Sequence, residues 1–439
     1  MISPGPRMAN TFAKSRSIKK NGPLSLVLLL VFLVPGPAFA QTLNAERELA
    51  RAMPRRTLFD LPKSYKDSTF QFFPIPIFQT DPAEGQRYGV MPTFLWYDKK
   101  DQLTTIVVTA LTYNPQVVKW GGYLGAYFYP SSKESLQLFI REGQNFEKDY
   151  YLYYNNESYL NNKLDLEGEF EYIQNPFERF FGFGPTTRKS NETNFVSHVW
   201  VGEGRAAYEF WPHINIQLDE KWVRLRIEPR ALNSLSDTSA IFGNNPEVRD
   251  FNQWIHRFSF FRDTRDSNDM PMTGHYVEPY ALISYHTFDG ETFYTGYGLL
   301  AKNYLTLQRR FTTVASFKVN QVFGDLVPFY LQPSLGGDSD LRAFVDNRFT
   351  GRGNILLDLE ERILIKRWTI LNAKFNFSLD PFFSVGQVFD NWGQVQFHNL
   401  QPVGGIGFRA KVPPSVVGRV DFGFGTEGMA IYMTLRYPF

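Results

Sequence analysis

The chain has 439 residues, of which 17% are aromatic, and its 46 Lys and Arg nearly balance its 44 Asp and Glu. A charge so close to neutrality gives no electrostatic support for a nucleic-acid partner. The chain contains no cysteine, which excludes disulfides, thiolate zinc sites and a cysteine nucleophile.

The N-terminal residues 1–40 have the features of a secretory signal peptide. Basic residues precede a short apolar stretch, Leu24–Val34, which is followed by the small-x-small sequence Ala38-Phe39-Ala40. The apolar stretch is too short for a membrane-spanning helix, which takes about 20 residues. We therefore predict a signal that is cleaved after Ala40, rather than a membrane anchor.

Residues 41–69 are charged and shorter than an independent domain, which takes at least about 50 residues. We predict that they form a short N-terminal arm in the periplasm or in the lumen of a barrel. From Phe70 onward, segments of roughly ten residues alternate between apolar and polar side chains, with Asn, Gly, Pro, Asp and Ser between the segments. This period of two predicts β-strands through residues 70–439.

The segment Lys163–Gln174 shows the alternation well. One face carries Leu164, Leu166, Gly168, Phe170 and Tyr172, and the other carries Lys163, Asp165, Glu167, Glu169 and Glu171. One apolar face and one charged face suit a strand with lipid outside and a water-filled lumen inside.

Strands of this kind span a bilayer only as a closed sheet, because in hydrocarbon every backbone N–H and C=O needs a partner. We therefore predict an all-β fold, a transmembrane antiparallel β-barrel. A strand needs about 9–11 residues to cross, so the chain has room for about 14 to 16 strands, and we expect 16. The free C-terminal Phe439 looks like the address signal of bacterial outer-membrane barrels, although a soluble β-sandwich can also end in a strand.

Three segments carry a distinctive order of motifs: Phe258–Glu278 (FSFFRDTRDSNDMPMTGHYVE), Gly336–Arg362 (GGDSDLRAFVDNRFTGRGNILLDLEER) and Pro402–Phe439. In this order they resemble the bacterial surface antigen family of outer-membrane barrels, which includes BamA and TamA. The segment Arg179–Thr187 (RFFGFGPTT) is also similar to members of this family. The resemblance covers most of the mature chain and implies a loop that folds into the lumen before the last third of the barrel.

The sequence departs from the family pattern in two places. Residues 41–69 cannot hold one of the usual POTRA domains, so the chain looks like a short, POTRA-less branch. The loop motif has Ala343 where the family usually has glycine. A Cβ is tolerable there only if the backbone does not need a positive φ.

The resemblance implies that Arg342 lies on the inward-folded loop and pairs with carboxylates of the inner wall, and Asp421 and Glu360 are the matching acids. A guanidinium has five donors in a planar fork, so it can clamp carboxylates and pin a loop inside a barrel. The alternative is an ordinary solvated arginine. The other residues of the loop motif and of the following E-x-R strand are Gly336, Gly337, Leu341, Phe344 and Arg362.

A second motif of the resemblance consists of Asp263, Arg265, Asp266, Pro271 and Gly274. It predicts either an inner-wall charge network or an ordinary polar strand end and turn. Both interpretations remain open, because a strand end needs residues of these types in any case.

Pro92 and Pro438 lie in the predicted first and last strands, which must pair to close the barrel, and Phe439 ends the last strand. Proline cannot donate to a strand ladder, so two prolines would weaken this seam. The resemblance implies that a weak seam opens sideways into lipid. Alternatively, each proline merely caps a strand end.

We find no pattern that indicates catalysis. The six histidines are scattered and support no metal site, and the sequence contains neither a nucleophile elbow nor a glycine-rich phosphate loop. We therefore expect no enzyme activity and no cofactor.

The resemblance implies a monomeric barrel in the bacterial outer membrane that aids insertion or translocation of proteins or lipids. Its expected partners are the lipid bilayer with its lipopolysaccharide, and client proteins or lipids. The alternatives are a passive porin-like channel or structural barrel and, with least support, an outer-membrane hydrolase.

Overall fold

The computed structural model describes residues 70–99, 103–131, 133–267, 270–287, 293–308, 310–370, 373–412 and 416–434. The predicted signal peptide, the predicted arm 41–69, Pro438 and Phe439 lie outside the described residues.

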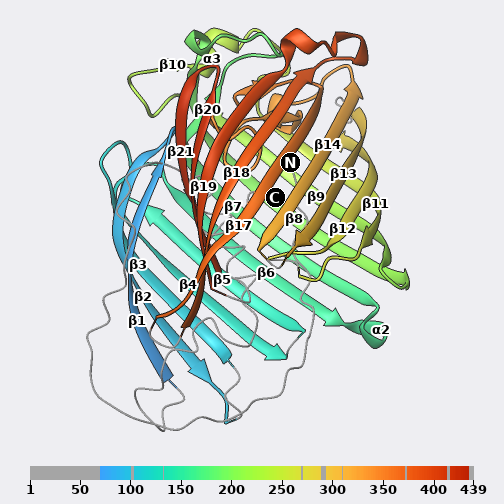
Figure 1. Ribbon diagram of the computed structural model, residues 1–439. Coiled ribbons are helices and arrows are strands. Elements are labelled where there is room, and N and C mark those ends of the chain that lie inside the picture. The colour runs from blue at the N-terminus through green and yellow to red at the C-terminus, as the bar shows by residue number, and fades with distance from the viewer. Residues whose placement is uncertain are drawn as a thin grey trace.

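One antiparallel sheet curls into a nearly closed barrel (Figure 1). Its 19 strands include the two-residue β10, which pairs in parallel with β8 beyond the wall, so the wall itself has 18 strands. These are β1 (Phe70–Asp81), β2 (Gly85–Tyr97), β3 (Leu103–Asn114), β4 (Lys119–Ser131), β5 (Glu134–Gly143), β6 (Lys148–Ser158), β7 (Leu164–Phe180), β8 (Thr193–Trp211), β9 (Ile214–Glu228), β11 (Phe251–Asp263), β12 (Gly274–His286), β13 (Phe293–Leu307), β14 (Phe311–Gly324), β17 (Gly353–Ile370), β18 (Ala373–Phe389), β19 (Gln401–Val412), β20 (Val416–Gly425) and β21 (Gly428–Thr434).

The remaining elements are short and lie in the connections between wall strands. They are α2 (Tyr159–Asn162), η1 (Lys189–Asn191), β10 (Ser236–Asp237), α3 (Thr238–Phe242), η2 (Phe329–Leu331), β15 (Ser334–Leu335), β16 (Phe349–Thr350), η3 (Trp392–Gln394) and η4 (Phe397–Asn399). Among the described residues, no helix is long and apolar enough to cross a bilayer.

The all-β barrel predicted from the sequence is confirmed, but the expected number of 16 strands is wrong. The estimate allowed each strand an average share of turn residues. Several turns are much tighter, such as residues 212–213 between β8 and β9. The residues saved in turns form an additional hairpin in the wall.

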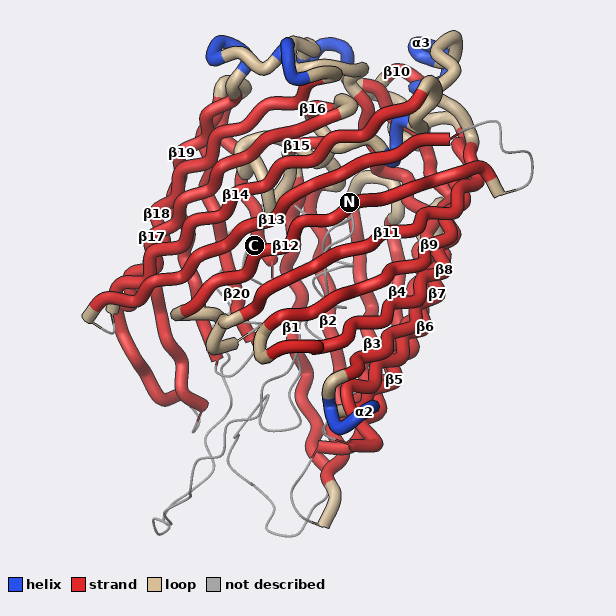
Figure 2. Tube along the Cα trace, turned by 90° about the vertical axis from the view of Figure 1, so that its right-hand side faces the viewer, coloured by secondary structure: helices blue, strands red, loops and turns tan. Residues whose placement is uncertain are grey.

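The two rims of the barrel differ in the length of their connections. One rim carries the start of β1, the end of β21 and mostly short turns, and Figure 2 shows α2 at this rim and α3 at the opposite one. The other carries the long connections 181–192, 229–250, 325–352 and 390–400. Outer-membrane barrels have short periplasmic turns and longer extracellular loops, so the rim with long connections is the extracellular one.

The wall strands point apolar side chains outward and polar or aromatic side chains inward. On β5, Leu136, Leu138 and Ile140 are each 38–39% exposed, whereas Gln137 and the other alternate residues are buried. In a bilayer the exposed apolar row meets hydrocarbon, which explains why it is stable without protein neighbours.

Leu138 lies near the middle of β5 on the outward face, so Leu138→Arg should place a charge in hydrocarbon. We expect the free energy of unfolding in lipid bilayers to fall by about 2–4 kcal/mol. Urea titration of the protein in vesicles measures this, with Leu138→Met as the control that changes shape but not charge. An arginine variant as stable as the methionine variant would contradict the assignment of this face to lipid.

Candidate functional site: the lumen loop and its wall

The connection between β14 and β17, residues 325–352, folds into the barrel, and we call it the lumen loop. Both of its ends are fastened to Glu247 in the connection between β9 and β11. Arg352 Nη2 lies 2.5 Å from Glu247 Oε1, Gln332 Nε2 donates to Oε2 at 3.0 Å, and the backbone N–H of Val327 donates to Oε1 at 3.2 Å. One carboxylate therefore holds the two limbs of the loop together near the extracellular rim.

Two glycines let the lumen loop reverse direction. Gly336 and Gly337 have φ of +123° and +98°, a region that side chains rarely adopt. A Cβ on Gly336 would also lie 2.2 Å from the carbonyl oxygen of Val345. The backbone N–H of Gly337 donates to the carbonyl of Phe344 at 2.9 Å and closes the reversed segment.

Ala343 fits where the family usually has glycine. It is not among the residues with positive φ, and its backbone N–H donates to the carbonyl of Leu341 at 2.7 Å. The departure from the family motif therefore does not prevent the loop from turning here.

Arg342 lies at the inner end of the loop and is fully buried. Its Nη1 is 2.9 Å from Glu360 Oε2 on β17 and 3.4 Å from Asp421 Oδ2 on β20. Its guanidinium carbon lies 3.5 Å from the centre of the Phe382 ring. The structure thus brings together the arginine and the two acids that the sequence analysis grouped, at the wall and away from water.

Glu360 receives two further arginines. Arg362 Nε lies 3.0 Å from Glu360 Oε1, and Arg409 Nη2 lies 3.3 Å from Oε2. Arg409 also contacts Asp421, at 2.5 Å, and Asp380, at 3.4 Å. Arg419 on β20 has its Nε 3.7 Å from Asp421 Oδ2 and also pairs with Asp338, so four guanidiniums and four carboxylates balance in one buried network. Such charges are tolerated away from water only when they are paired.

Two further ion pairs join the loop to the wall. Arg419 Nη2 on β20 lies 2.5 Å from Asp338 Oδ2 and donates to the carbonyl of Asp338 at 2.7 Å. Lys318 Nζ on β14 lies 2.5 Å from Asp340 Oδ1. The inner limb of the loop is thus held from both sides.

The loop backbone lies directly against β20 because that strand has a glycine there. A Cβ on Gly423 would lie 2.0 Å from the carbonyl oxygen of Arg342. Leu341, Ala343 and Phe344 then pack into a buried apolar cluster with wall residues, which include Leu356, Phe382, Val388 and Val403. The D-x-G sequence of β20 therefore supplies both an acid for the clamp and the space for the clamped backbone.

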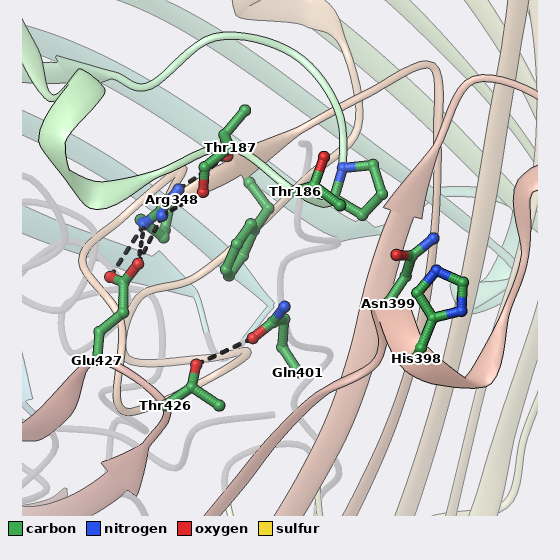
Figure 3. A pocket seen from close by; sticks show the side chains of 10 residues that line it. Thr186, Thr187, Arg348, His398, Asn399, Gln401, Thr426 and Glu427 are labelled. Atoms are coloured by element: carbon green, nitrogen blue, oxygen red, sulfur yellow. Dashed lines mark hydrogen bonds and ion pairs between the residues drawn. The ribbon is translucent and has the colours of Figure 1, made fainter.

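The limb of the loop that returns to β17 is fixed at the extracellular mouth by Arg348. Its Nη2 lies 2.5 Å from Glu427 Oε1 in the β20–β21 turn and donates to the carbonyl of Thr187 at 2.7 Å (Figure 3). Its guanidinium carbon is 4.5 Å from the centre of the Phe181 ring. Thr187 and Phe181 belong to the segment 179–187 that resembles the family, so this segment is a docking partner of the loop.

The neighbouring Asp346 is electrostatically unusual. Burial, reinforced by the charges of Asp81 and Asp338, raises the pKa of the Asp346 carboxyl well above its ordinary value. The folded loop therefore favours the protonated form. The stability that the protonated Asp346 carboxyl contributes to the folded protein is present at low pH and is lost as the pH rises through the raised pKa.

The second motif forms the turn between β11 and β12 at the periplasmic rim. Arg265 Nη2 lies 2.7 Å from Asp263 Oδ2, and Asp266 Oδ1 accepts the backbone N–H of Met272 at 2.8 Å. Gly274 has a φ of +99°. The described residues of the motif mainly organise a turn, which is the plainer of the two interpretations.

This turn is nevertheless connected to the buried network. Arg362 Nη1 donates to the carbonyl of Pro271 at 3.1 Å, while its Nε contacts Glu360. Arg362 therefore bridges the clamp and the periplasmic turn.

The seam of the barrel differs from its prediction. Pro92 lies in β2 and faces Pro74 of β1, so its placement in the first strand is wrong. The first strand was missed because its sequence, FQFFPIPIFQTD, has two prolines and little polar alternation. β1 and β21 lie next to each other, but in the described segments 70–81 and 428–434 no backbone pairing joins them.

The geometry also reveals residues that the sequence analysis did not single out. They are Arg409, Arg419, Asp380, Asp338, Arg348 and Glu247. A signal existed for two of them, because Arg409 and Arg419 alternate with apolar residues in strands and must therefore point into the lumen.

A model of the Omp85 superfamily domain matches residues 137–425, which is more than half of the chain. The chain belongs to the Omp85 superfamily. This membership confirms the resemblance to surface antigen barrels and places the protein in an outer membrane. No curated protein matches the chain.

Two solved structures are similar to this Omp85 barrel. BamA from Haemophilus ducreyi lacking POTRA domains 1–3 is 12% identical, with a TM-score of 0.51 over 77% of this chain and 73% of that chain. CdiB from Escherichia coli is 9% identical, with a TM-score of 0.49 over 85% of this chain and 64% of that chain. The first of these likenesses supports the barrel fold.

Arg342→Ala should release the lumen loop, because it removes one partner of a buried ion pair, a change that costs about 3–5 kcal/mol. We expect a larger single-channel conductance in planar bilayers and a lower urea midpoint. Arg342→Lys keeps the positive charge but loses the planar guanidinium, so we expect a conductance and a urea midpoint between those of the wild type and of Arg342→Ala.

Gly423→Ala provides an independent variant, because its Cβ would displace the carbonyl of Arg342 without altering a charge. The matched control is Gly404→Ala, since a Cβ on the outward-facing Gly404 meets no atom within 4 Å. If Arg342→Ala leaves both conductance and stability unchanged, the clamp has no role.

Proposed function

We propose that this Omp85 barrel aids the insertion or translocation of proteins or lipids at the outer membrane. The observation that carries the proposal is a loop held by ion pairs beside a seam at which the described segments 70–81 and 428–434 show no backbone pairing. The loop is held by side-chain ion pairs, which can break and re-form, whereas the wall around it is held by continuous backbone hydrogen bonds between neighbouring strands.

The residues of β1 favour a weak seam. The β2–β3 ladder has no partner for Pro92, although β1 pairs with β2 along its whole length. Proline has no backbone N–H, and at Pro92 the vacant donor position therefore faces β3. At its partner Pro74 the vacant donor position faces β21. Pro76, two residues further along, has the same orientation. The free edge of β1 thus lacks two donors.

The lumen loop contacts the seam directly. The hydroxyl of Tyr432 on β21 donates to the carbonyl of Phe344 at 2.5 Å, and the ring of Tyr432 is buried. Release of the loop would therefore remove a contact of the last strand, and separation of that strand would disturb the loop. This coupling favours a barrel that opens for a client over a fixed pore.

We propose that the chain is exported by a signal cleaved after Ala40, works as a monomeric barrel among phospholipid and lipopolysaccharide, and carries out no catalysis.

Deletion of the gene, followed by quantitative outer-membrane proteomics and lipid analysis of the same membranes, tests the function. We expect selective loss of particular outer-membrane proteins, restored by the wild-type gene and not by Arg342→Ala. An altered lipid balance with an intact proteome would indicate that the barrel acts on lipids rather than on proteins. If neither changes, the proposal is wrong and a passive channel or structural barrel remains.

A further inference from the structure

The inward face of β2–β5 carries apolar side chains, although it lines the lumen. Leu95 of β2, Ile106 and Val108 of β3 and Phe139 of β5 point into the barrel, and their side chains are only 0–7% exposed. The alternate residues of these strands point to lipid, and Leu138 is 39% exposed. A lumen filled with water does not bury apolar side chains in this way. We call the following inward residues the lumen patch: Leu95, Ile106, Val108, Gln137 and Phe139.

A second layer of protein must lie over the lumen patch. The buried cluster that contains its apolar side chains consists, among the described residues, of members of β1–β6 alone, which are neighbours in one sheet. The lumen loop packs against β17, β18 and β19 instead. One face of a sheet reaches such burial only against a second layer, which lies about 10 Å away. The cover of the patch therefore comes from a segment outside the described residues or from another molecule.

Gln137 indicates that this cover is a polypeptide. It is in register with Tyr127 of β4, which is in register with Ile106, so its side chain lies within the patch. Gln137 is fully buried, and among the described residues neither its Oε1 nor its Nε2 has a hydrogen-bond partner. An unpaired buried amide is costly. A carboxamide has an acceptor and a donor side by side, which match the N–H and C=O groups of a peptide backbone.

The lumen patch borders an acidic row on β7. Gln137 is in register with Tyr153 of β6, and Tyr153 is in register with Glu169 of β7. A polypeptide that lies on the patch and continues toward β7 is favoured there if it carries basic residues. The acidic row consists of the inward residues Asp165, Glu167, Glu169 and Glu171.

The predicted arm, residues 41–69, joins the wall beside the patch. It leads directly into Phe70, the first residue of β1, whose register partner is Trp96 of β2. The patch begins at Leu95, the residue next to Trp96. The six strand spacings from β1 to β7 span about 29 Å, which an extended chain covers with about nine residues. The arm is therefore long enough to cross the patch and to reach the acidic row.

The composition of the arm matches both surfaces. Its six Lys and Arg outnumber its four Asp and Glu, and Arg55 and Arg56 are adjacent. An arm that runs from Phe70 over the patch toward β7 brings apolar residues to the patch before these arginines reach the acidic row. The apolar residues between the two arginines and the start of β1 include Leu58, Phe59 and Leu61.

We propose that the predicted arm, residues 41–69, binds the lumen patch. The segment 58–61 lies against the apolar side chains, the arm backbone forms hydrogen bonds with the Gln137 amide, and Arg55 and Arg56 pair with the acidic row of β7. The arm and the lumen loop then occupy different sides of the lumen, the arm along β2–β7 and the loop along β17–β20. The chain thereby supplies a plug of its own, whether or not the barrel transports a client.

Two phenylalanines of the β4–β5 hairpin allow a matched test by photo-cross-linking in outer membranes. Phe139 belongs to the patch, whereas Phe128 of β4 faces lipid and is 40% exposed. The photoreactive analogue p-benzoylphenylalanine retains the phenyl ring at either position. After irradiation of the full mature protein, we expect position 139 to form an adduct with residues 41–69, identified by mass spectrometry of the digest. Position 128 should form none.

Charge reversal in the arm tests the contact with β7. Arg55→Glu together with Arg56→Glu places like charges beside the acidic row, and we expect the yield of the adduct from position 139 to fall about fivefold. The matched control, Arg55→Lys together with Arg56→Lys, keeps the charge and should stay within about twofold of the unsubstituted arm. Removal of residues 41–69, with the signal retained, should raise the single-channel conductance because it unblocks the lumen.

The proposal is overturned if position 139 of a folded barrel reacts only with another protein or with no partner, or if positions 139 and 128 give equal yields of the arm adduct. Unchanged conductance after removal of the arm would equally contradict the plug. Migration on gels that changes with heating confirms that each variant has folded. Because cross-linking reports contact and not transport, failure here leaves the proposed function of the barrel standing.

Discussion

A single buried carboxylate, Glu360, organises the interior of this barrel. It accepts guanidiniums from the lumen loop, from its own strand and from β19, and none of these groups reaches bulk water. An unpaired buried charge at this position would have a high free-energy cost. Withdrawal of the loop would leave wall charges unpaired, and this cost holds the loop in place. The glycine of β20, the aromatic ring of Phe382 and the apolar cluster around Phe344 complete a surface that only the loop covers.

The wall and the loop follow different physical rules. The wall satisfies its backbone through ladders and meets hydrocarbon with apolar side chains, so it resists opening at every interior strand pair. The loop is held by side-chain contacts at two levels, with Glu247 and Arg348 near the mouth and Arg342 at the inner end. The seam between β1 and β21 is the place where the two meet, because Tyr432 contacts the loop from the last strand.

Much of this architecture was predictable from the sequence. Period-two alternation identified the barrel, and the order of motifs grouped Arg342 with Glu360 and Asp421. The number of strands was not predictable, because it depends on turn lengths that the alternation does not encode. The position of Pro92 was missed for a related reason, since two prolines interrupt the pattern of the strand before it.

Cross-strand relations were also beyond sequence reasoning. The three arginines at Glu360 come from the lumen loop, from β17 itself and from β19, and only the three-dimensional structure shows that they converge. The apolar and charged faces could be read from each strand, whereas sites depend on how neighbouring strands align.

The inward position of the loop is the central claim, and a disulfide cross-link tests it most directly, because the chain has no cysteine of its own. A Cβ on Gly425 would lie 2.9 Å from the Ala343 Cβ, and a shift of about 0.6 Å brings the two Cβ atoms to the roughly 3.5 Å that a disulfide spans, so Ala343→Cys with Gly425→Cys places two thiols within reach of one bond. In oxidised outer membranes the double variant should form an internal disulfide, detected as a reducible mobility shift, and each single variant should not. A double variant that folds but forms no disulfide under these conditions would show that the loop does not lie against β20.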